Sequence, residues 1–208
     1  MLPPPFRPTF SDYKRVTELI LFHHAQGLTR GVTDFADELR AAGHVVHTPD
    51  AYEGKTFATL ADGIAYAREV GFDTIFERSR SAAERLPAEV VYGGFSLGVP
   101  PAQMLAQTRP GARGALLFHS AIPLSEFGGQ WPRGVPLQIH MMDKDEWVLP
   151  PETDLATARE LARTIDGAEL FLYPGDHHLF ADSSLPDFDP SSAALLKQRV
   201  LGFLNDLG

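Results

Sequence analysis

Short apolar segments that alternate with longer helical patterns are the feature that most limits how this chain can fold. Two of these segments, residues 19–22 (Leu-Ile-Leu-Phe) and 115–118 (Ala-Leu-Leu-Phe), are continuous apolar runs. A strand has this composition when both of its faces are buried, as in a parallel sheet that is covered by helices. The predicted strands are Thr17–His23, His44–Thr48, Glu89–Gly93, Gly114–Phe118, Leu137–Met141 and Glu169–Tyr173.

Helical patterns occupy the segments between these strands. Thr33–Ala42 is expected to end at Gly43, because glycine readily adopts the left-handed backbone that often follows a helix. Leu60–Leu86 is predicted to form one long helix, or two shorter helices that break near Gly71. The other predicted helices are Ala102–Thr108, Thr153–Ile165 and Ser191–Leu207. Strands that alternate with helices in this way predict an α/β fold, with a mostly parallel central sheet and helices on both of its faces.

The length of the chain predicts one domain over residues 1–208, since a domain usually has about 100–200 residues. Residues 1–14 contain Pro3, Pro4, Pro5 and Pro8. Because proline cannot donate a hydrogen bond to a β-ladder, we expect this segment to form an extended N-terminal arm.

Composition restricts the partners and the chemistry of the chain. Its formal net charge is −9, which argues against nucleic acid and anionic membranes, since both attract a surplus of lysine and arginine. The absence of cysteine excludes disulfides, thiolate metal sites and a cysteine nucleophile. The sequence contains no signal-peptide core and no apolar run of about 18 residues, so a cytoplasmic protein is expected. Its expected oligomeric state is a monomer or a homodimer.

The pentapeptide Gly94-Phe95-Ser96-Leu97-Gly98 lies between a predicted strand and a predicted helix. A Gly-x-Ser-x-Gly sequence at such a position is typical of a nucleophile elbow, a tight turn that exposes the serine oxygen. Glycines relieve crowding in this turn and permit unusual backbone angles. The bare pentapeptide also occurs by chance as a structural turn, but the strand–turn–helix context favours Ser96 as a nucleophile.

Two aspartates follow the predicted strand Leu137–Met141, and either is a candidate for the acid of a catalytic triad. In folds with this elbow the chain order is serine, then aspartate or glutamate, then histidine. Asp145 is favoured over Asp143, because it precedes Val148 by three positions, the usual distance to the apolar residue that anchors this loop. The other aspartate would be a solvated turn residue or a cap.

Two histidines, His177 and His178, follow the last predicted strand. A histidine at this place can accept the serine proton while the aspartate fixes its tautomer. The pattern His-x-Phe, in which Phe180 would pack behind the ring, favours His178 as the base. His177 would then be a neighbour that fills space.

Two backbone N–H groups are expected to bind the oxyanion of the reaction. The first is that of Leu97, at a helix N-terminus where negative charge is stabilised. The second should come from the loop after the first strand, where Ala25 is the first candidate and Gln26 the second.

The remaining polar and aromatic residues at this edge of the sheet have simpler explanations. His23 and His24 are adjacent, and adjacent residues of a strand point to opposite faces, so they are not expected to bind one metal ion. No metal site is therefore predicted. Residues expected near the substrate, each with core packing as the alternative, are Gln26, Tyr52, Phe95, His119, Ile122 and Phe180.

Four stretches together resemble the dienelactone hydrolase family of the α/β-hydrolase superfamily. They are the first strand with the Gly27 loop, residues 48–52 (Thr-Pro-Asp-Ala-Tyr), the elbow, and residues 173–181 (Tyr-Pro-Gly-Asp-His-His-Leu-Phe-Ala). The resemblance implies an α/β hydrolase without a lid or cap domain, which acts on small esters or lactones without a cofactor. About 16 residues precede the first clear strand, so about six or seven strands are expected rather than eight.

Two residues depart from the pattern of this family. Dienelactone hydrolases have a cysteine nucleophile where this sequence has Ser96, and an arginine that holds the substrate carboxylate where it has Asp182. An aspartate would repel a carboxylate. A neutral ester, lactone or thioester is therefore expected as substrate, rather than dienelactone.

The sequence as a whole predicts a serine hydrolase that cleaves a small carboxylic ester, lactone or thioester through an acyl-serine intermediate. The alternative from another class is a catalytically inactive, hydrolase-like domain that serves in binding or as a scaffold. Such domains typically lack a triad member, whereas this chain has candidates for all three. Cleavage of carbon–carbon or peptide bonds is a third possibility, which the lack of an insertion long enough for a lid disfavours.

Overall fold

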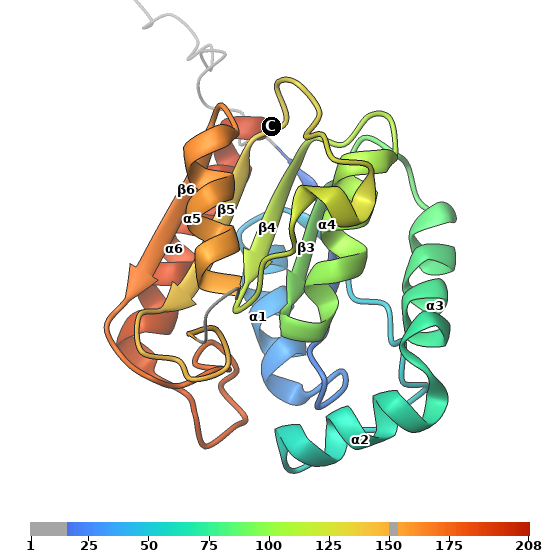
Figure 1. The fold of residues 1–208 in the computed structure, drawn as a ribbon, viewed down its shortest axis with the longest axis vertical. Helices are drawn as coiled ribbons and strands as arrows, with labels where there is room; N and C mark the ends of the chain where they lie inside the picture. Colours follow the sequence, from blue (N-terminus) through green and yellow to red (C-terminus); the bar gives the residue numbers. More distant parts are fainter. Residues whose placement is uncertain (1–15, 150–153) are drawn as a thin grey trace, which may run out of the picture.

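Six strands form one parallel sheet in a computed structural model, which describes residues 16–149 and 154–208 (Figure 1). The strand order is β2-β1-β3-β4-β5-β6, with every neighbouring pair parallel. The predicted arm of residues 1–14 lies outside the described residues. The strands are β1 Glu18–Phe22, β2 Val45–His47, β3 Val91–Phe95, β4 Gly114–Phe118, β5 Leu137–Met142 and β6 Ala168–Tyr173.

Six α-helices connect and cover these strands. They are α1 Arg30–Ala41, α2 Leu60–Val70, α3 Phe72–Glu84, α4 Val99–Thr108, α5 Asp154–Thr164 and α6 Pro190–Leu207. The predicted break near Gly71 is present, with φ of 92° at that glycine. Helix α4 begins before the predicted Ala102, because Pro100 and Pro101 lie in its first turn, where the missing N–H groups are not needed.

The third strand lies two residues further along the chain than predicted. Its ladder with β1 begins at Val91, and its ladder with β4 extends to Phe95, which pairs with Phe118. The expected strand Glu89–Gly93 was therefore wrong at both ends. Glu89 is exposed and outside the sheet, whereas Phe95 is buried within it. The later end of β3 places Ser96 directly after the last strand residue.

The core lies on both faces of the sheet, as the continuous apolar strands predict. In β1 the side chains of Ile20 and Phe22 pack with helices α3, α4 and α5, whereas Leu19 and Leu21 pack with α1 and α6. Figure 1 shows α4 and α5 in front of the sheet and α1 and α6 behind it. Because these strands are parallel, the carboxyl ends of β1, β3, β4, β5 and β6 lie along one edge of the sheet.

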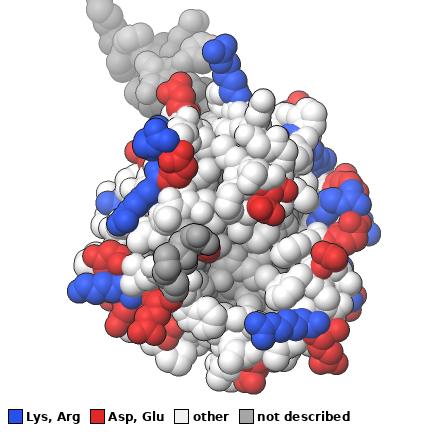
Figure 2. Space-filling model, in the orientation of Figure 1, with Lys and Arg blue, Asp and Glu red and all other residues white. Residues whose placement is uncertain are grey.

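Among the described residues, no inserted domain covers that edge, in agreement with the predicted absence of a cap. No described helix has the length and apolar character that a membrane span requires. On the face in Figure 2, acidic and basic side chains are interspersed around the periphery, and uncharged side chains fill much of the centre.

The buried centre of the sheet should dominate stability. Leu117 in β4 is fully buried, whereas Leu172 in the edge strand β6 is 39% exposed. We expect Leu117→Ala to lower the free energy of unfolding by about 2–5 kcal/mol, through lost burial and a cavity. The matched change Leu172→Ala should cost less than about 1 kcal/mol. Urea denaturation of both variants is the measurement, and equal losses would contradict this division between core and edge.

Candidate active site

The turn between β3 and α4 holds Ser96 in a strained backbone conformation. Its φ is 47°, in the left-handed region that residues with a side chain seldom occupy. A single 3₁₀ turn, Ser96–Gly98, links the strand to α4. Non-glycine residues in such conformations persist only where the surrounding structure imposes them, which is common at functional sites.

Glycine is required on both sides of this serine because backbone approaches backbone. A Cβ at Gly94 would lie 2.1 Å from the carbonyl oxygen of Gly98, and a Cβ at Gly98 would lie 2.5 Å from that of Phe22. The first contact closes the turn on itself. The second presses the turn against the end of β1. The Gly-x-Ser-x-Gly pattern thus reflects two separate steric demands.

Ser96, His178 and Asp145 form one chain of hydrogen bonds. Ser96 Oγ is 2.8 Å from His178 Nε2, and His178 Nδ1 is 2.6 Å from Asp145 Oδ2. A carboxylate can only accept, so Nδ1 carries the proton and Nε2 accepts from the serine hydroxyl. Asp145 and His178 are 1% and 6% exposed, whereas Ser96 is only partly buried. Ser96 is therefore the least buried member of this chain.

The competing aspartate and histidine lie elsewhere. Asp143 is exposed, and its Oδ1 accepts a hydrogen bond of 3.1 Å from the Gly175 amide. His177 is also exposed, and its Nδ1 lies 2.8 Å from the carbonyl oxygen of Asp187. Both are turn residues of the same two loops, held away from Ser96.

Local contacts fix the acid loop after β5. The second oxygen of Asp145 accepts a 2.9 Å hydrogen bond from the Trp147 amide, and the Asp145 carbonyl accepts from the Val148 amide. Val148 is fully buried, in the anchoring position that its spacing suggested. Trp147 is 56% exposed, and its ring centre lies 5.8 Å from that of His178. An apolar surface therefore borders the imidazole.

His119 is the neighbour of Ser96 on the next strand. Phe95 pairs with Phe118, so Ser96 and His119, the residues that follow them, lie at the same level of the sheet. His119 also has a positive φ, of 67°. The His119 ring is buried 5.9 Å from that of His178, and its Nδ1 has no partner among the described residues. Burial, with the nearby His178, holds the pKa of His119 well below its usual range. His119 thus adds no positive charge beside His178.

Sequence reasoning missed one acidic side chain near these residues. Asp154, the first residue of α5, accepts a 2.5 Å hydrogen bond from the Ser120 hydroxyl. Burial raises the pKa of this carboxyl group, although the hydrogen bonds from Ser120 and the Ala121 backbone act in the opposite direction. Asp154 also lies close enough to His178 and Asp145 for an electrostatic interaction with each of them. No local motif marks it, because its position depends on how α5 packs on the sheet.

Several residues expected near the substrate pack into the core. Tyr52, Phe95, His119 and Phe180 are at most 3% exposed. They form part of continuous ring contacts, such as Phe95 on Phe118 and His119 on Phe180. Substrate contact by these four remains a prediction.

Gln26 and Ile122 are held by hydrogen bonds. The Gln26 side chain donates to the Phe57 carbonyl at 3.1 Å, and the Ile122 amide donates to the Gln103 side chain at 3.0 Å. Ile122 is partly buried and Gln26 is 5% exposed. Their contact with substrate also remains a prediction.

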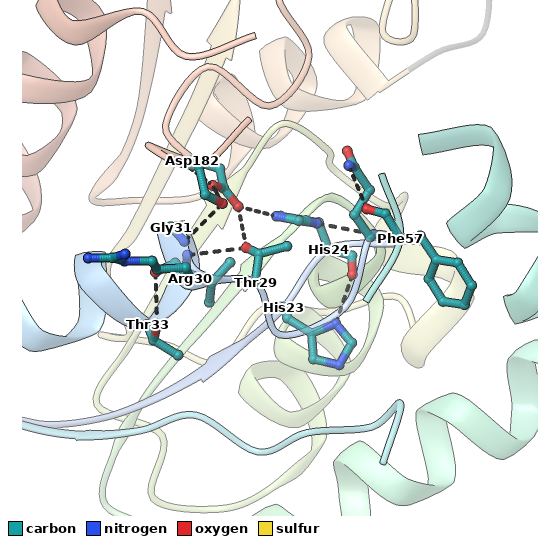
Figure 3. A network of polar contacts seen from close by, with 11 residues as sticks. His23, His24, Thr29, Arg30, Gly31, Thr33, Phe57 and Asp182 are labelled. Atoms are coloured by element: carbon teal, nitrogen blue, oxygen red, sulfur yellow. Dashed lines mark hydrogen bonds and ion pairs between the residues drawn. The ribbon is translucent and has the colours of Figure 1, made fainter. Parts of the chain in front are cut away.

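Asp182 is a buried anchor rather than an exposed repelling charge. It is 4% exposed and lies 2.8 Å from the ring Nε2 of His24, on the loop after β1 (Figure 3). His23 points the opposite way, with its Nε2 3.1 Å from the Ala51 amide. The two adjacent histidines thus serve different contacts. Among the described residues, no group of three or more His, Cys, Asp or Glu side chains is arranged to hold a metal ion.

Comparisons with known proteins identify the family and the fold. A model of the Dienelactone hydrolase family matches residues 8–208. No curated protein sequence matches the chain. Among solved structures, a dienelactone hydrolase-like promiscuous phosphotriesterase from metagenomic libraries has a TM-score of 0.71 at 18% identity, over 95% of this chain and 89% of its own.

Two further structures share the fold. A dienelactone hydrolase from Anabaena variabilis has a TM-score of 0.63 at 17% identity, covering 90% of this chain and 85% of its own. An esterase has a TM-score of 0.64 at 15% identity, covering 92% and 93%. At such identities the likeness extends to the fold alone.

The steric account of the elbow predicts the effect of one methyl group. Gly94→Ala should lower the free energy of unfolding by more than about 2 kcal/mol, because the new Cβ meets backbone that cannot move aside. Gly202→Ala, in α6 with open space around it, is the matched control and should be neutral or slightly stabilising. Denaturant titration compares the two. A Gly94→Ala protein as stable as the control would refute the account.

The free energy of unfolding should decrease at acidic pH, because the folded protein buries histidines in their neutral form. Burial lowers the pKa of His23 from 6.5 to about 4 and that of His140 to about 3. Between these values and 6.5 the unfolded chain binds more protons than the folded one, so stability decreases as the pH falls. Each histidine contributes a slope of about 1 kcal/mol per pH unit in this window.

The free energy of unfolding, measured between about pH 6 and pH 4.5, tests this linkage. His140→Asn should have a shallower slope than the unmodified protein, whereas the exposed control His177→Asn should leave the slope unchanged. A wild-type stability that is constant over this range would contradict the prediction.

Proposed function

We propose that this chain, which belongs to the dienelactone hydrolase family and is therefore an ester-bond hydrolase, cleaves its substrate through an acyl-serine intermediate. The observation that carries the proposal is the hydrogen-bonded chain from Ser96 through His178 to Asp145, with distances of 2.8 and 2.6 Å. A serine hydroxyl becomes a useful nucleophile only when a base takes its proton. The partly buried Ser96, with its Oγ within hydrogen-bonding distance of His178 Nε2, meets that requirement.

In the first half of the proposed reaction, Ser96 Oγ attacks the carbonyl carbon while His178 Nε2 takes the hydroxyl proton. The carbonyl π electrons move to oxygen, and a tetrahedral oxyanion forms. The imidazolium is stabilised by the buried carboxylate of Asp145, which does not itself become protonated. When the oxyanion collapses, the bond to the leaving group breaks, and His178 returns the proton to the departing oxygen or sulfur.

Water completes the cycle in the second half. His178 Nε2 now takes a proton from a water molecule, whose oxygen attacks the acyl carbon. A second tetrahedral oxyanion collapses, the bond to Ser96 Oγ breaks, and the proton passes to Ser96. The products are a carboxylic acid and the alcohol or thiol, or one hydroxy acid from a lactone. No step requires a cofactor.

The proposed oxyanion donors are the backbone N–H groups of Leu97 and Ala25. Leu97 follows the nucleophile in the turn at the start of α4, where helix N–H groups lack intrahelical partners. In the loop after β1, the backbone N–H groups of Gln26 and Gly27 donate hydrogen bonds within the described residues, whereas that of Ala25 does not. This difference favours Ala25 over Gln26 as the second donor.

A small, neutral ester, lactone or thioester is the proposed substrate class. The buried position of Asp182 removes the expected repulsion, but it also leaves no cation there to hold a carboxylate. The exposed Trp147 ring beside His178 offers an apolar surface for an acyl or leaving group. One solved structure with this fold is called an esterase and another a promiscuous phosphotriesterase. A panel of esters, lactones and thioesters should define the preference of this chain.

Ser96 should be the residue that reacts. A fluorophosphonate probe should label the folded protein at one equivalent, and Ser96→Ala should abolish labelling and reduce kcat by about 10³-fold or more. Intact mass spectrometry counts the label. An unlabelled, folded wild-type protein without esterase activity would instead support the non-catalytic binding or scaffold alternative.

Two neighbouring aspartates provide a matched test of the acid. Asp145→Asn should lower kcat by about 10²–10⁴-fold, because the amide no longer fixes the tautomer of His178. Asp143→Asn removes the same charge two residues earlier but does not contact His178, and should change kcat by less than about threefold. Similar losses of kcat in both variants would show that a change in the loop, rather than the loss of the Asp145 carboxylate, lowers the activity.

A further inference from the structure

We propose that His24 and Asp182 are positioning residues that hold the loop after β1, so that the Ala25 N–H stays aimed at the oxygen of the carbonyl group that Ser96 attacks. The inference rests on the proposed function and extends it to residues that touch neither substrate nor triad. It follows from the hydrogen bonds around the His24–Ala25 peptide.

The carbonyl of His24 determines where the Ala25 N–H points. The described chain has no cis peptide bond, so this carbonyl and the Ala25 N–H point in opposite directions. The carbonyl oxygen accepts from His23 Nδ1 at 2.7 Å and from the Gly27 amide at 3.0 Å. These two bonds fix the peptide plane. They also place the proton of the neutral His23 ring on Nδ1.

The ring of His24 fixes the next peptide. The ring Nδ1 accepts a 3.2 Å hydrogen bond from the backbone N–H of Gln26. The proton of the His24 ring therefore lies on Nε2, which donates it to Asp182 Oδ2 at 2.8 Å. The Gln26 N–H is thereby used within the loop and turned away from the role of an oxyanion donor. In Figure 3 the His24 ring bridges the loop and Asp182.

Asp182 is held as firmly as the ring that it binds. Its Oδ2 also accepts from the Thr29 hydroxyl, and its Oδ1 accepts from the amide and the hydroxyl of Ser184 at 2.8 and 2.6 Å. Burial alone would raise the pKa of Asp182, but the hydrogen bonds from His24, Ser184 and Thr29 outweigh it and lower the pKa. Thr29 caps the N-terminus of α1, where a negative charge is favourable.

The fold leaves space for this carboxylate. A Cβ at Gly31, in the first turn of α1, would lie 1.7 Å from Asp182 Oδ1. Asp182 also follows His178 by four residues, and its amide donates to the Leu179 carbonyl at 3.0 Å. One buried side chain thus ties the loop of the base to the loop of the proposed oxyanion donor.

Asp182→Asn tests this role, because it keeps the shape of the side chain but weakens its acceptance from His24. We expect kcat for p-nitrophenyl acetate, per active site titrated with fluorophosphonate, to fall about 10- to 100-fold, since loss of an oxyanion donor costs about 10²–10³-fold. KM should change by less than about threefold. The inhibition constant of an aryl trifluoromethyl ketone, which forms a tetrahedral oxyanion on serine, should rise by the same factor as kcat falls.

Asp189→Asn is the matched control. Asp189 lies in the same loop and caps α6 by accepting from the Ser192 amide at 2.7 Å, without contact to His24. It should lower Tm but leave kcat and the inhibition constant unchanged. His24→Asn, which breaks the bond to Asp182 from the other side, should resemble Asp182→Asn, and it serves in its place if that variant does not fold.

Two results would overturn the inference. One is a kcat and an inhibition constant in Asp182→Asn equal to those of Asp189→Asn. The other is a change in KM alone, which would indicate substrate contact. Either result leaves the proposed function intact as long as the unmodified protein hydrolyses the ester, whereas an inactive, unlabelled wild-type protein would count against the proposed function itself.

Discussion

The close contact between the Ser96 turn and the end of β1 is the constraint on which the rest of the site depends. Gly98 lies so near the Phe22 carbonyl that no side chain fits between them. The same turn holds Ser96 in its left-handed conformation, and the contact sets the end of β1 beside the start of α4. The proposed nucleophile and the Leu97 N–H thus lie in a turn that backbone packing defines, whereas the Ala25 N–H also depends on the side chains that hold its loop.

Two sets of hydrogen-bonded, buried polar side chains lie around that contact. Asp145 and His178 lead to the nucleophile, whereas Asp182 and His24 lead to the loop of the proposed oxyanion donor. Both carboxylates are almost completely buried, and buried polar groups of this kind are tolerable only when they are fully hydrogen-bonded. Such networks rigidify a site, and the loop that contains His178 and Asp182 belongs to both of them.

The fold and the hydrogen bonds that join Ser96, His178 and Asp145 were largely predictable because they depend on local signals. Apolar strands buried on two faces predicted the parallel sheet, and the spacing to Val148 favoured the aspartate that the structure places against His178. Strand ends were less predictable: β3 ends at Phe95 because it pairs with Phe118, which is a long-range contact. The role of Asp182 was misread for the same reason. Only the packing of α1 against the loop after His178 brings Thr29 and His24 to that carboxylate.

The central claim is that Ser96 carries the acyl group during turnover. Rapid mixing with p-nitrophenyl acetate, acid quenching and peptide mapping by mass spectrometry would observe that intermediate directly. The account predicts one acetyl group on the peptide that contains Ser96, formed as fast as the burst of p-nitrophenol. Steady hydrolysis with no acetylated peptide, or with the acetyl group on another residue, would contradict it.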